Sequence, residues 1–415
     1  MLAVSGAAFG SGFGIFEQGA KASAMGGAFV ATADDPSAIF YNVAGIAQQR
    51  HITFLAGGTV INFNNQFTGD PNDPLTVGTT AQYAKHTFIP PNVYLIIPWG
   101  SNLTFGVGVF TPFGLRTNWE EPWIGRFVSR DANVKTIDVE PAVAWQTTDG
   151  RLAIGVGADY RRSHIVLNRN NAGFNPLTGR IFDSANAYLN SDWDTTTGWN
   201  AGILLKPTPT WRLGLSYRSD ATIDYKGTAK FTQILTGTPL DPIVAAQIPP
   251  TQSIATSINF PAILAGGIAT TAIGHNWDLE ADITHTTWSR FKSLKVVFGT
   301  TTALNFDRPQ DWKDTYSYRI GANKKVNDMW DVRFGGIYDK NPQPDAGVGP
   351  LLPDSDRLAA CFGIGWHSGP FIVDVSEMAL HFKNRNTLGI VQNDNFHGSY
   401  KTNANLISFN AGIRF

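Results

Sequence analysis

The sequence predicts an all-β protein, a fourteen-stranded antiparallel transmembrane β-barrel with a short, partly helical N-terminal segment inside its lumen. Three observations predict this fold. Apolar residues alternate with polar ones, with a period of two, in several segments of about ten residues. Only 16% of the 415 residues are charged, against roughly a quarter in typical soluble domains. No apolar run approaches the ~18 residues of a membrane helix, so a spanning form must be a closed barrel.

The last residues of the chain, NLISFNAGIRF, show the alternation most clearly. Ile407, Phe409, Ala411, Ile413 and Phe415 share one parity, so they lie on one face of a strand. An exposed apolar strand at a terminus invites aggregation. We therefore expect this strand to pair with the first one, closing the barrel with its apolar face in lipid. Outer-membrane proteins commonly end in such a strand with a terminal Phe, which resembles the signal read by their barrel-assembly machinery.

Earlier segments repeat the pattern, with charges and glycines on one face and Trp or Tyr at an end of the other. A wet lumen and an interfacial aromatic girdle would have this character. The clearest segments cover 137–145, 152–160, 211–217, 277–283 and 330–338. Short turns alternate with long Pro/Asn/Gly-rich stretches, expected as loops, near 64–85, 166–192, 228–256 and 339–356. About fourteen segments are counted, an even number as in bacterial barrels. The alternative is a soluble β-sandwich with aromatic-rich strands.

Residues 1–47 lack this alternation and are rich in Ala and Gly, so we place a domain boundary there and the barrel over 48–415. Asp34-Asp35-Pro36 predicts a helix start, with a carboxylate cap and Pro in the first turn. About two turns should follow, ending near residues 42–45. We expect this compact segment to pack in the lumen as a plug; the alternative is a disordered or periplasmic tail.

Charge and cysteine content set further bounds. The formal net charge of −1 gives no global field that favours nucleic acid or anionic lipid. The single Cys361 excludes an internal disulfide and says little about the compartment. Residues 1–10 lack a charged start and a long apolar core, so we expect the signal peptide of an exported protein to be absent from this numbering.

Five stretches carry a resemblance to a known family. The segment GIFEQGAKASAMGGAFVATADDPSAIFYNVAGIA resembles the N-terminal hatch of the long-chain fatty acid transporter family of outer-membrane proteins, which includes the toluene and xylene channels. Four more follow in family order: GVGVFTPFGLRTNWEEPWIGRF, TTDGRLAIGVGADY, DWKDTYSYRIGANKKVNDMWDVRFGGIYDKNPQP and LLPDSDRLAACFGIGW. The resemblance implies a fourteen-stranded barrel with an inserted hatch. It implies that hydrophobic ligands bind first in an apolar groove among outer loops, move to an internal site, and leave sideways beside a kinked third strand.

The resemblance also assigns a gating role to hatch residues of this chain. They are Phe16, Glu17, Asp34, Asp35, Phe40, Asn42, Val43, Ala44 and Gly45. One of them departs from the family, whose motif is Asn-Pro-Ala-Gly where this chain has Val43 in place of proline. Proline would restrict φ and remove a backbone donor. Its absence either loosens this end of the hatch or adds one hydrogen bond.

Two long stretches supply apolar candidates for an outer ligand groove. The expected residues are Phe174, Leu177, Ile181, Phe182, Leu240, Ile243, Val244 and Ile248. The alternative is that they form small cores within their own loops.

Cations are the candidates for anchoring a carboxylate head group. The resemblance points to Lys313, and the parity of 316–322 turns both Lys313 and Arg319 toward the lumen. Strict alternation turns Arg161 inward, whereas a loose family alignment favours Arg162. The alternative is that these cations are charge-paired residues that only keep the lumen wall hydrated.

A lateral exit is expected on one strand. Leu103, Phe105, Val107 and Val109 would face lipid while Gly106 and Gly108 line the other side, ahead of Pro112. Glycine within a strand weakens it and permits a kink or bulge. This strand is therefore the predicted site of a lateral opening.

Catalysis has no support in the sequence. The motifs G-x-S-x-G, H-E-x-x-H and G-x-x-x-x-G-K-[ST] are absent, and the eight His residues show no metal-ligand spacing. Asp278, Glu280 and Asp282 share a face, but at strand spacing such acids usually line a wet lumen. We expect no enzyme activity, no cofactor and no metal.

These observations together predict a monomeric protein of the bacterial outer membrane that passively takes up hydrophobic small molecules. Long-chain fatty acids are the first expected ligand and aromatic hydrocarbons the second. Outer-membrane lipid and lipopolysaccharide are expected neighbours. The runner-up is a general diffusion porin in which residues 1–47 form a constriction, and a third class is an adhesin or structural barrel.

Overall fold

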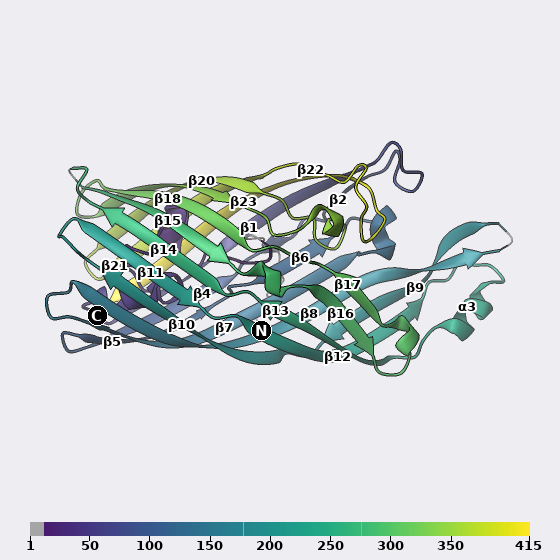
Figure 1. The fold of residues 1–415 in the computed structure, drawn as a ribbon, viewed down its shortest axis with the longest axis horizontal. Coiled ribbons are helices and arrows are strands. Elements are labelled where there is room, and N and C mark those ends of the chain that lie inside the picture. Colours follow the sequence, from purple (N-terminus) through teal and green to yellow (C-terminus); the bar gives the residue numbers. More distant parts are fainter. Residues whose placement is uncertain (1–11, 177, 275) are drawn as a thin grey trace.

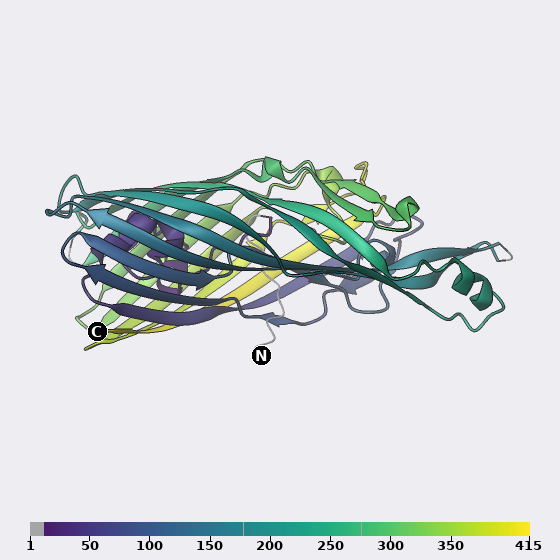
Figure 2. The ribbon, with the colours of Figure 1, turned by 90° about the horizontal axis from the view of Figure 1, so that it is seen from below.

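Fourteen antiparallel strands close into a barrel in the computed structural model, which describes residues 12–176, 178–274 and 276–415 (Figures 1 and 2). In order around the barrel the strands are β1 (Thr53–Gly69), β4 (Pro91–Trp99), β5 (Leu103–Phe110), β7 (Asp131–Gln146), β8 (Leu152–Asn175), β10 (Asp194–Leu205), β11 (Trp211–Arg218), β14 (Ile263–Thr270), β15 (Trp277–Thr286), β18 (Thr315–Lys325), β19 (Trp330–Asp339), β20 (Arg357–Ser368), β21 (Phe371–Phe382) and β23 (Gly398–Arg414). The ring closes where β23 pairs with β1, from Thr53↔Arg414 to Gly69↔Gly398. The predicted barrel and its closing strand are confirmed.

A second group of strands continues the sheet beyond the barrel at one end, where the hairpins are long (Figure 1). They are β9 (Arg180–Ser191), β12 (Ala221–Gln233), β13 (Gln252–Phe260), β16 (Ser293–Phe298) and β17 (Phe306–Pro309). Shorter strands are β2 (Thr80–Gln82), β3 (Thr87–Phe88), β6 (Gly114–Asn118) and β22 (Arg385–Asn386). The stretch 166–192, expected as a loop, is therefore largely strand, and 228–256 is strand at both ends with α3 between them. That expectation was wrong because a hairpin in water needs no regular apolar face.

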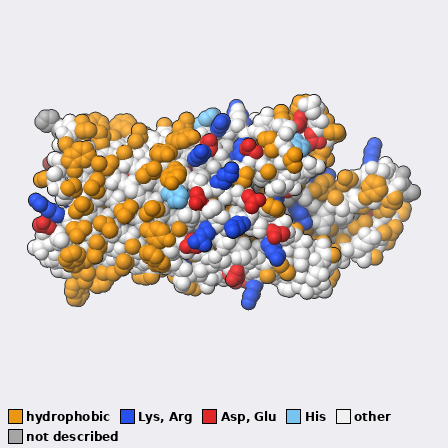
Figure 3. Space-filling view, viewed as in Figure 1, with side chains coloured by type: hydrophobic (Ala, Val, Ile, Leu, Met, Phe, Trp, Pro, Cys, Tyr) orange, Lys and Arg blue, Asp and Glu red, His pale blue; other side chains and the backbone are white. Residues whose placement is uncertain are grey.

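Side chains alternate across the barrel wall as predicted. On β7, Val139 and Trp145 are exposed while Asp138 and Glu140 are fully buried on the inside. Apolar side chains form a continuous belt around one half of the molecule, as the face in Figure 3 shows. Such a belt on an antiparallel barrel is the surface that faces lipid. Among the described residues, no helix is both long enough and apolar enough to cross a membrane.

Residues 13–47, the inner segment, lie inside the belted half of the barrel (Figure 2). The segment contains α1 (Ala20–Ala24), α2 (Ala38–Tyr41) and the 3-10 helix η1 (Val43–Gln48). The helix start expected at the Asp-Asp-Pro sequence falls slightly later, and the Asp35 carboxylate accepts the Ser37 N–H at 2.8 Å. The other helices are α3 (Asp241–Gln247), η2 (Ile124–Phe127), η3 (Trp288–Arg290), η4 (Thr302–Leu304) and η5 (Asp345–Gly347).

Two acidic side chains of β15 hold the inner segment by its backbone. Asp282 Oδ2 accepts the N–H groups of Phe29 and Val30 at 2.8 and 3.0 Å. Glu280 accepts those of Ala31 and Thr32 at 2.6 and 3.0 Å. Four consecutive backbone donors are thus satisfied by the wall. The acids expected to line a wet lumen are buried and act as an attachment point.

Candidate ligand-binding site

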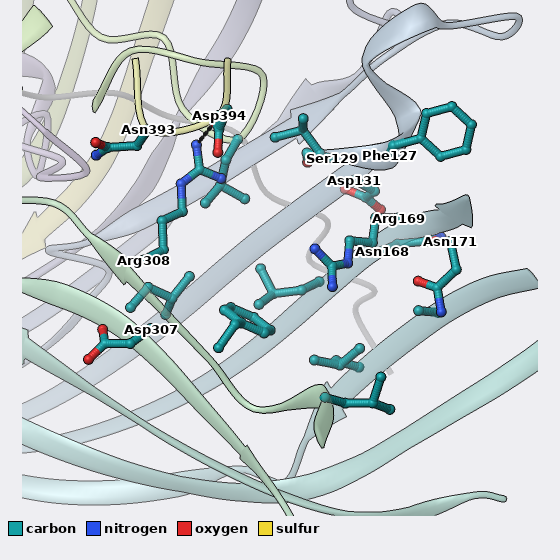
Figure 4. Close-up of a pocket in the computed structure, with 18 of the residues that line it drawn as sticks. Phe127, Ser129, Asp131, Asn168, Arg169, Asn171, Asp307, Arg308, Asn393 and Asp394 are labelled. Carbon is teal, nitrogen blue, oxygen red and sulfur yellow. Dashed lines mark hydrogen bonds and ion pairs between the residues drawn. The ribbon is translucent and has the colours of Figure 1, made fainter. Parts of the chain in front are cut away.

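A cavity of about 300 Å³ opens at the long-hairpin end of the barrel (Figure 4). The extended sheet supplies one wall through β8, β9, β12, β16 and β17. The chain after η2 and the segments near 351 and 394 close the other side. Its lining residues are Phe127, Val128, Ser129, Asp131, Leu167, Asn168, Arg169, Asn171, Ala187, Leu189, Phe231, Leu294, Phe298, Leu304, Phe306, Asp307, Arg308, Pro309, Leu351, Asn393 and Asp394.

The inner surface of this cavity is mostly apolar. Leu189 of β9 and Phe298 of β16 belong to a buried cluster that joins the neighbouring hairpins. Phe231 and Phe306 pack against that cluster and line the cavity. Apolar walls with a few placed polar groups are the usual composition of a site for a small hydrophobic ligand.

Two arginines, Arg169 and Arg308, and three aspartates, Asp131, Asp307 and Asp394, carry the charges of the cavity (Figure 4). The Arg308 guanidinium forms an ion pair with Asp394. Arg169 lies 5.3 Å from the centre of the Phe306 ring. Arg169 is exposed to the open cavity. Partial loss of hydration and the positive charge of Arg308 lower its pKa, against the opposing effect of the Asp394 carboxylate. No carboxylate of the described residues lies within ion-pair distance of Arg169, so an anionic ligand group would complete its pairing.

An aromatic cluster fills the lumen where the barrel core continues from the cavity, and the cavity residue Leu294 belongs to the same core. The cluster is centred on Phe13, the tip of the inner segment, which is 2% exposed. Its ring contacts lie between 4.7 and 6.1 Å and are made with Phe113, Phe260, Trp288, Phe291 and Trp312. We call these six residues the aromatic plug.

The wall next to the plug is broken. β5 and β6 both pair with β7, but three residues, 111–113, stand opposite two, 136–137, because the pairing jumps from Phe110↔Asp138 to Gly114↔Lys135. The tip of the inner segment covers this bulge. Ile15 N donates to Pro112 O at 2.8 Å, and Gly114 N donates to Phe13 O at 2.9 Å. The bulge in the wall, the tip of the inner segment and the aromatic plug are therefore in contact with one another.

The glycines predicted for this strand face the inner segment. A Cβ at Gly106 would lie 3.0 Å from Ile39 Cδ1, and one at Gly108 would lie 3.1 Å from Ile39 Cγ2. Both glycines thus allow close packing of α2 on β5. Their predicted part in a lateral opening stays a prediction.

The predicted lumen arginines differ in their placement. Arg161 is buried inside and pairs with Asp138 at 2.7 Å, while Arg162 is exposed on the outer face. Arg319 is buried and donates to Gly26 O at 2.9 Å. The two inward arginines therefore have protein partners, and neither lines the cavity.

Lys313 lies in a different place from the one expected. It is exposed on the outside of the wall, in a cleft with Lys340 and Lys383, whereas Trp312 before it points into the plug. The expected orientation toward the lumen is therefore not found. A role for Lys313 in ligand binding stays a prediction.

The predicted outer groove residues also lie away from the cavity. Phe174, Ile181 and Phe182 are near the tip of the β8–β9 hairpin, and Leu240, Ile243, Val244 and Ile248 lie in or beside α3, both at the far end in Figures 1 and 2. Leu177 is outside the described residues.

The predicted gating residues lie in the inner segment, and all but the 42% exposed Asp34 are buried or half-buried there. Burial raises the pKa of Glu17, and the Asp34 carboxylate pairs with Lys21 at 2.7 Å. The Asn42 side chain donates to Val30 O at 2.8 Å and accepts the Ala44 N–H at 3.2 Å. The remaining ones, Phe16, Asp35, Phe40, Val43 and Gly45, lie in the same packed segment.

Arg169 was missed because its segment looked like a loop. Even so, the sequence contained a signal, since a period-two count from the inward Arg161 reaches Arg169 after eight residues. Continuing the count past the end of the apolar belt would have placed this cation on the inner face.

Comparisons with known proteins agree with this fold. The family model described as outer membrane protein transport protein (OMPP1/FadL/TodX) matches residues 1–415. The long-chain fatty acid transport protein of Salmonella typhi is 26% identical over 371 residues, covering 86% of this chain and 83% of that protein. Outer membrane protein P1 of Haemophilus influenzae is 22% identical over 476 residues, covering 100% and 97%.

Solved structures show the same fold. The crystal structure of a Pseudomonas aeruginosa FadL homologue superposes with a TM-score of 0.83 at 21% identity, covering 97% of this chain and 99% of that one. The toluene transporter TodX of Pseudomonas putida superposes with a TM-score of 0.75 at 16% identity, covering 96% and 98%.

Proposed function

The chain belongs to the outer membrane protein transport protein family (OMPP1/FadL/TodX), and we propose that its own ligands are, in the first place, long-chain fatty acids. Members of this family are outer-membrane transport channels for hydrophobic compounds and not enzymes. We propose three details beyond this family function: the fatty-acid ligand, its route through the barrel, and the gate on that route.

The observation that carries the fatty-acid proposal is the position of Arg169. Its guanidinium has no carboxylate partner among the described residues and projects into a cavity with apolar walls. A fatty acid matches both features, since its carboxylate can pair with Arg169 while its alkyl chain covers the walls. Charge-assisted hydrogen bonds of this kind are about twice as strong as neutral ones.

The plug and the bulge support a route from this cavity to lipid. A ligand leaving the cavity meets the aromatic plug, whose Phe13 belongs to the inner segment. Displacing that tip would also break its two backbone hydrogen bonds to the bulge. We propose that ligand binding shifts the tip, and that the ligand leaves sideways through the bulge between β5 and β7.

The test is equilibrium binding of a fluorescent long-chain fatty acid to the purified protein in detergent. Arg169→Met keeps the apolar stem, and we expect binding about 10- to 100-fold weaker because one charged hydrogen-bond partner is lost. Arg180→Met, at the start of β9 and outside the cavity, is the matched control. Equal affinity in wild type and Arg169→Met would refute the head-group role.

Aromatic hydrocarbons are the second candidate, favoured by the apolar cavity wall and by the fold shared with the toluene transporter TodX. Displacement of the probe by toluene but not by oleate would establish them. A general porin would instead pass sugars into liposomes. Because the inner segment is packed in the lumen, we expect no passage of sugars.

A further inference from the structure

Charged side chains gather in a band just beyond the apolar belt, on the side of the long hairpins (Figure 3). A cleft of about 450 Å³ lies on the outer wall where β18, β19, β20 and β21 end. Four cations from three separate segments of the chain line it: Lys313, Lys340, Lys383 and Arg385. Such a concentration needs an explanation, because like charges repel one another.

The cleft faces away from the lumen. Lys340 comes two residues after Tyr338 and Lys383 two residues after His381, and both of those side chains are exposed on the outer face. Both lysines stand one residue past the ends of β19 and β21, but Lys340 N donates to Tyr316 O at 3.4 Å and Lys383 N donates to Asp356 O at 2.7 Å. The pairing, and with it the alternation of faces, therefore continues as far as these two residues. Lys313 lines the same cleft. The three lysines therefore belong to the membrane side of the wall.

The acids within the cleft are already occupied. Arg385 pairs with Asp345 at 2.7 Å and also donates to the carbonyl oxygens of Gln343 and Asp354, at 2.6 and 2.7 Å. Asp356 accepts both the backbone and the side-chain N–H of Asn341, at 3.0 and 2.7 Å.

Two lysines of the cleft remain without such partners. Neither Lys313 nor Lys383 has a side-chain acceptor among the described residues. With four cations and two acids, the cleft has a formal charge of 4 − 2 = +2. This net positive charge favours an anionic occupant.

The height of the cleft identifies the kind of anion. Tyr316 and Tyr338, 47% and 42% exposed, stand at the rim of the apolar belt; Lys313 lies three residues before Tyr316, and Lys340 lies two residues after Tyr338. At about 3.3 Å per residue this places the backbone of these two lysines at most roughly 7–10 Å beyond that of the tyrosines. Interfacial Tyr residues lie at head-group level, so the cleft lies where the phosphates of the surrounding lipid are found.

We propose that this cleft binds the phosphate groups of the outer-leaflet glycolipid, lipopolysaccharide, and so fixes a lipid molecule against β18–β21. Lysine binds phosphate as a point charge. Arg385, which is held by Asp345 and two carbonyl oxygens, keeps the loops of the cleft in place. The proposal does not depend on which hydrophobic compound the channel transports.

The test measures binding of fluorescently labelled lipopolysaccharide to the full-length protein in detergent. The variant Lys313→Ala/Lys340→Ala/Lys383→Ala should bind about 100-fold more weakly, since each lysine near a charged lipid surface contributes roughly fivefold. The control Lys226→Ala/Lys230→Ala/Lys295→Ala removes the same charge from exposed positions outside the cleft and should bind like wild type. Replacing the three cleft lysines by arginine should keep the binding.

Competitors identify the source of the phosphate. Unlabelled lipopolysaccharide should displace the probe, and dephosphorylated lipopolysaccharide or millimolar inorganic phosphate should not. Equal losses in the cleft and control variants would overturn the proposal, as would displacement by inorganic phosphate alone. If the cleft variant lost fatty-acid binding and kept lipopolysaccharide binding, the cleft would be a ligand anchor and the proposal would be wrong.

Discussion

Replacing Phe13 by alanine should release the tip of the inner segment. Phe13 is 2% exposed and touches five other rings. Burying a Phe side chain stabilises by about 1.5–3 kcal/mol, and aromatic pairs add about 0.5–1.5 kcal/mol each. Neighbouring rings partly fill the gap left by Phe13, which recovers part of this free energy. We therefore take about 3 kcal/mol as the net loss in the free energy that holds the tip in place. This corresponds to an about 150-fold larger fraction of molecules in which the tip is released.

The assay follows the tip through a reporter cysteine. Ile15 is fully buried beside Phe13, and Cys361 is the only native cysteine. In an Ile15→Cys/Cys361→Ser background, the rate of maleimide labelling reports how often the tip is released. Phe13→Ala should raise that rate by about two orders of magnitude. The control is Phe105→Ala, the same change at a 43% exposed position of the outer wall. A rise of less than about threefold, or an equal rise in the control, would refute a plug held by Phe13.

Three further changes probe how the inner segment is held. Asp282→Ala leaves two buried N–H groups without acceptors, which costs about 1–3 kcal/mol each. Trypsin should then cleave the inner segment at least tenfold faster. An unchanged cleavage rate would argue against the attachment. Gly335→Ala places a Cβ against inner-segment backbone and should unseat it, whereas Gly336→Ala, whose nearest contact is an ordinary 3.4 Å, should be neutral in the same digestion. Burial raises the pKa of Asp354, which accepts the Gly12 N–H at 3.0 Å, to about 6. Its carboxyl therefore stabilises the folded state below about pH 4, and this is lost as pH rises through about 6. Asp354→Asn should reduce the fall in unfolding temperature between pH 4 and pH 7, and an unchanged fall would contradict the assignment.

The barrel could be predicted because a spanning strand has to satisfy two solvents. Lipid outside and polar groups inside force the strict alternation seen at Val139 and Glu140. The same alternation could not distinguish a wet lumen from a packed one. Glu280 and Asp282 look identical in sequence whether they face water or the backbone of the inner segment.

The candidate site was harder to predict because it lies beyond the membrane, where the alternation no longer applies. Arg169 and Phe306 are far apart in sequence and meet only because β8, β9, β12, β13, β16 and β17 form one extended sheet. Lys313 was expected inside by counting back from Tyr316. β18 begins only at Thr315, so Lys313 lies before the strand and the alternation counted back from Tyr316 does not apply to it.

The seam between β1 and β23 sets an order of events during biogenesis. Residues 13–47 precede every wall strand in the chain, yet they end up enclosed by a ring that only the last strand completes. While that seam is open, the segment can reach β15 and the glycines of β19 from the side, and once it is shut the segment has to enter through an end of the barrel. Slow closure of the ring would thus favour correct packing of the inner segment inside the barrel. A mutation that speeds closure could yield a stable, well-inserted protein that is nevertheless assembled empty.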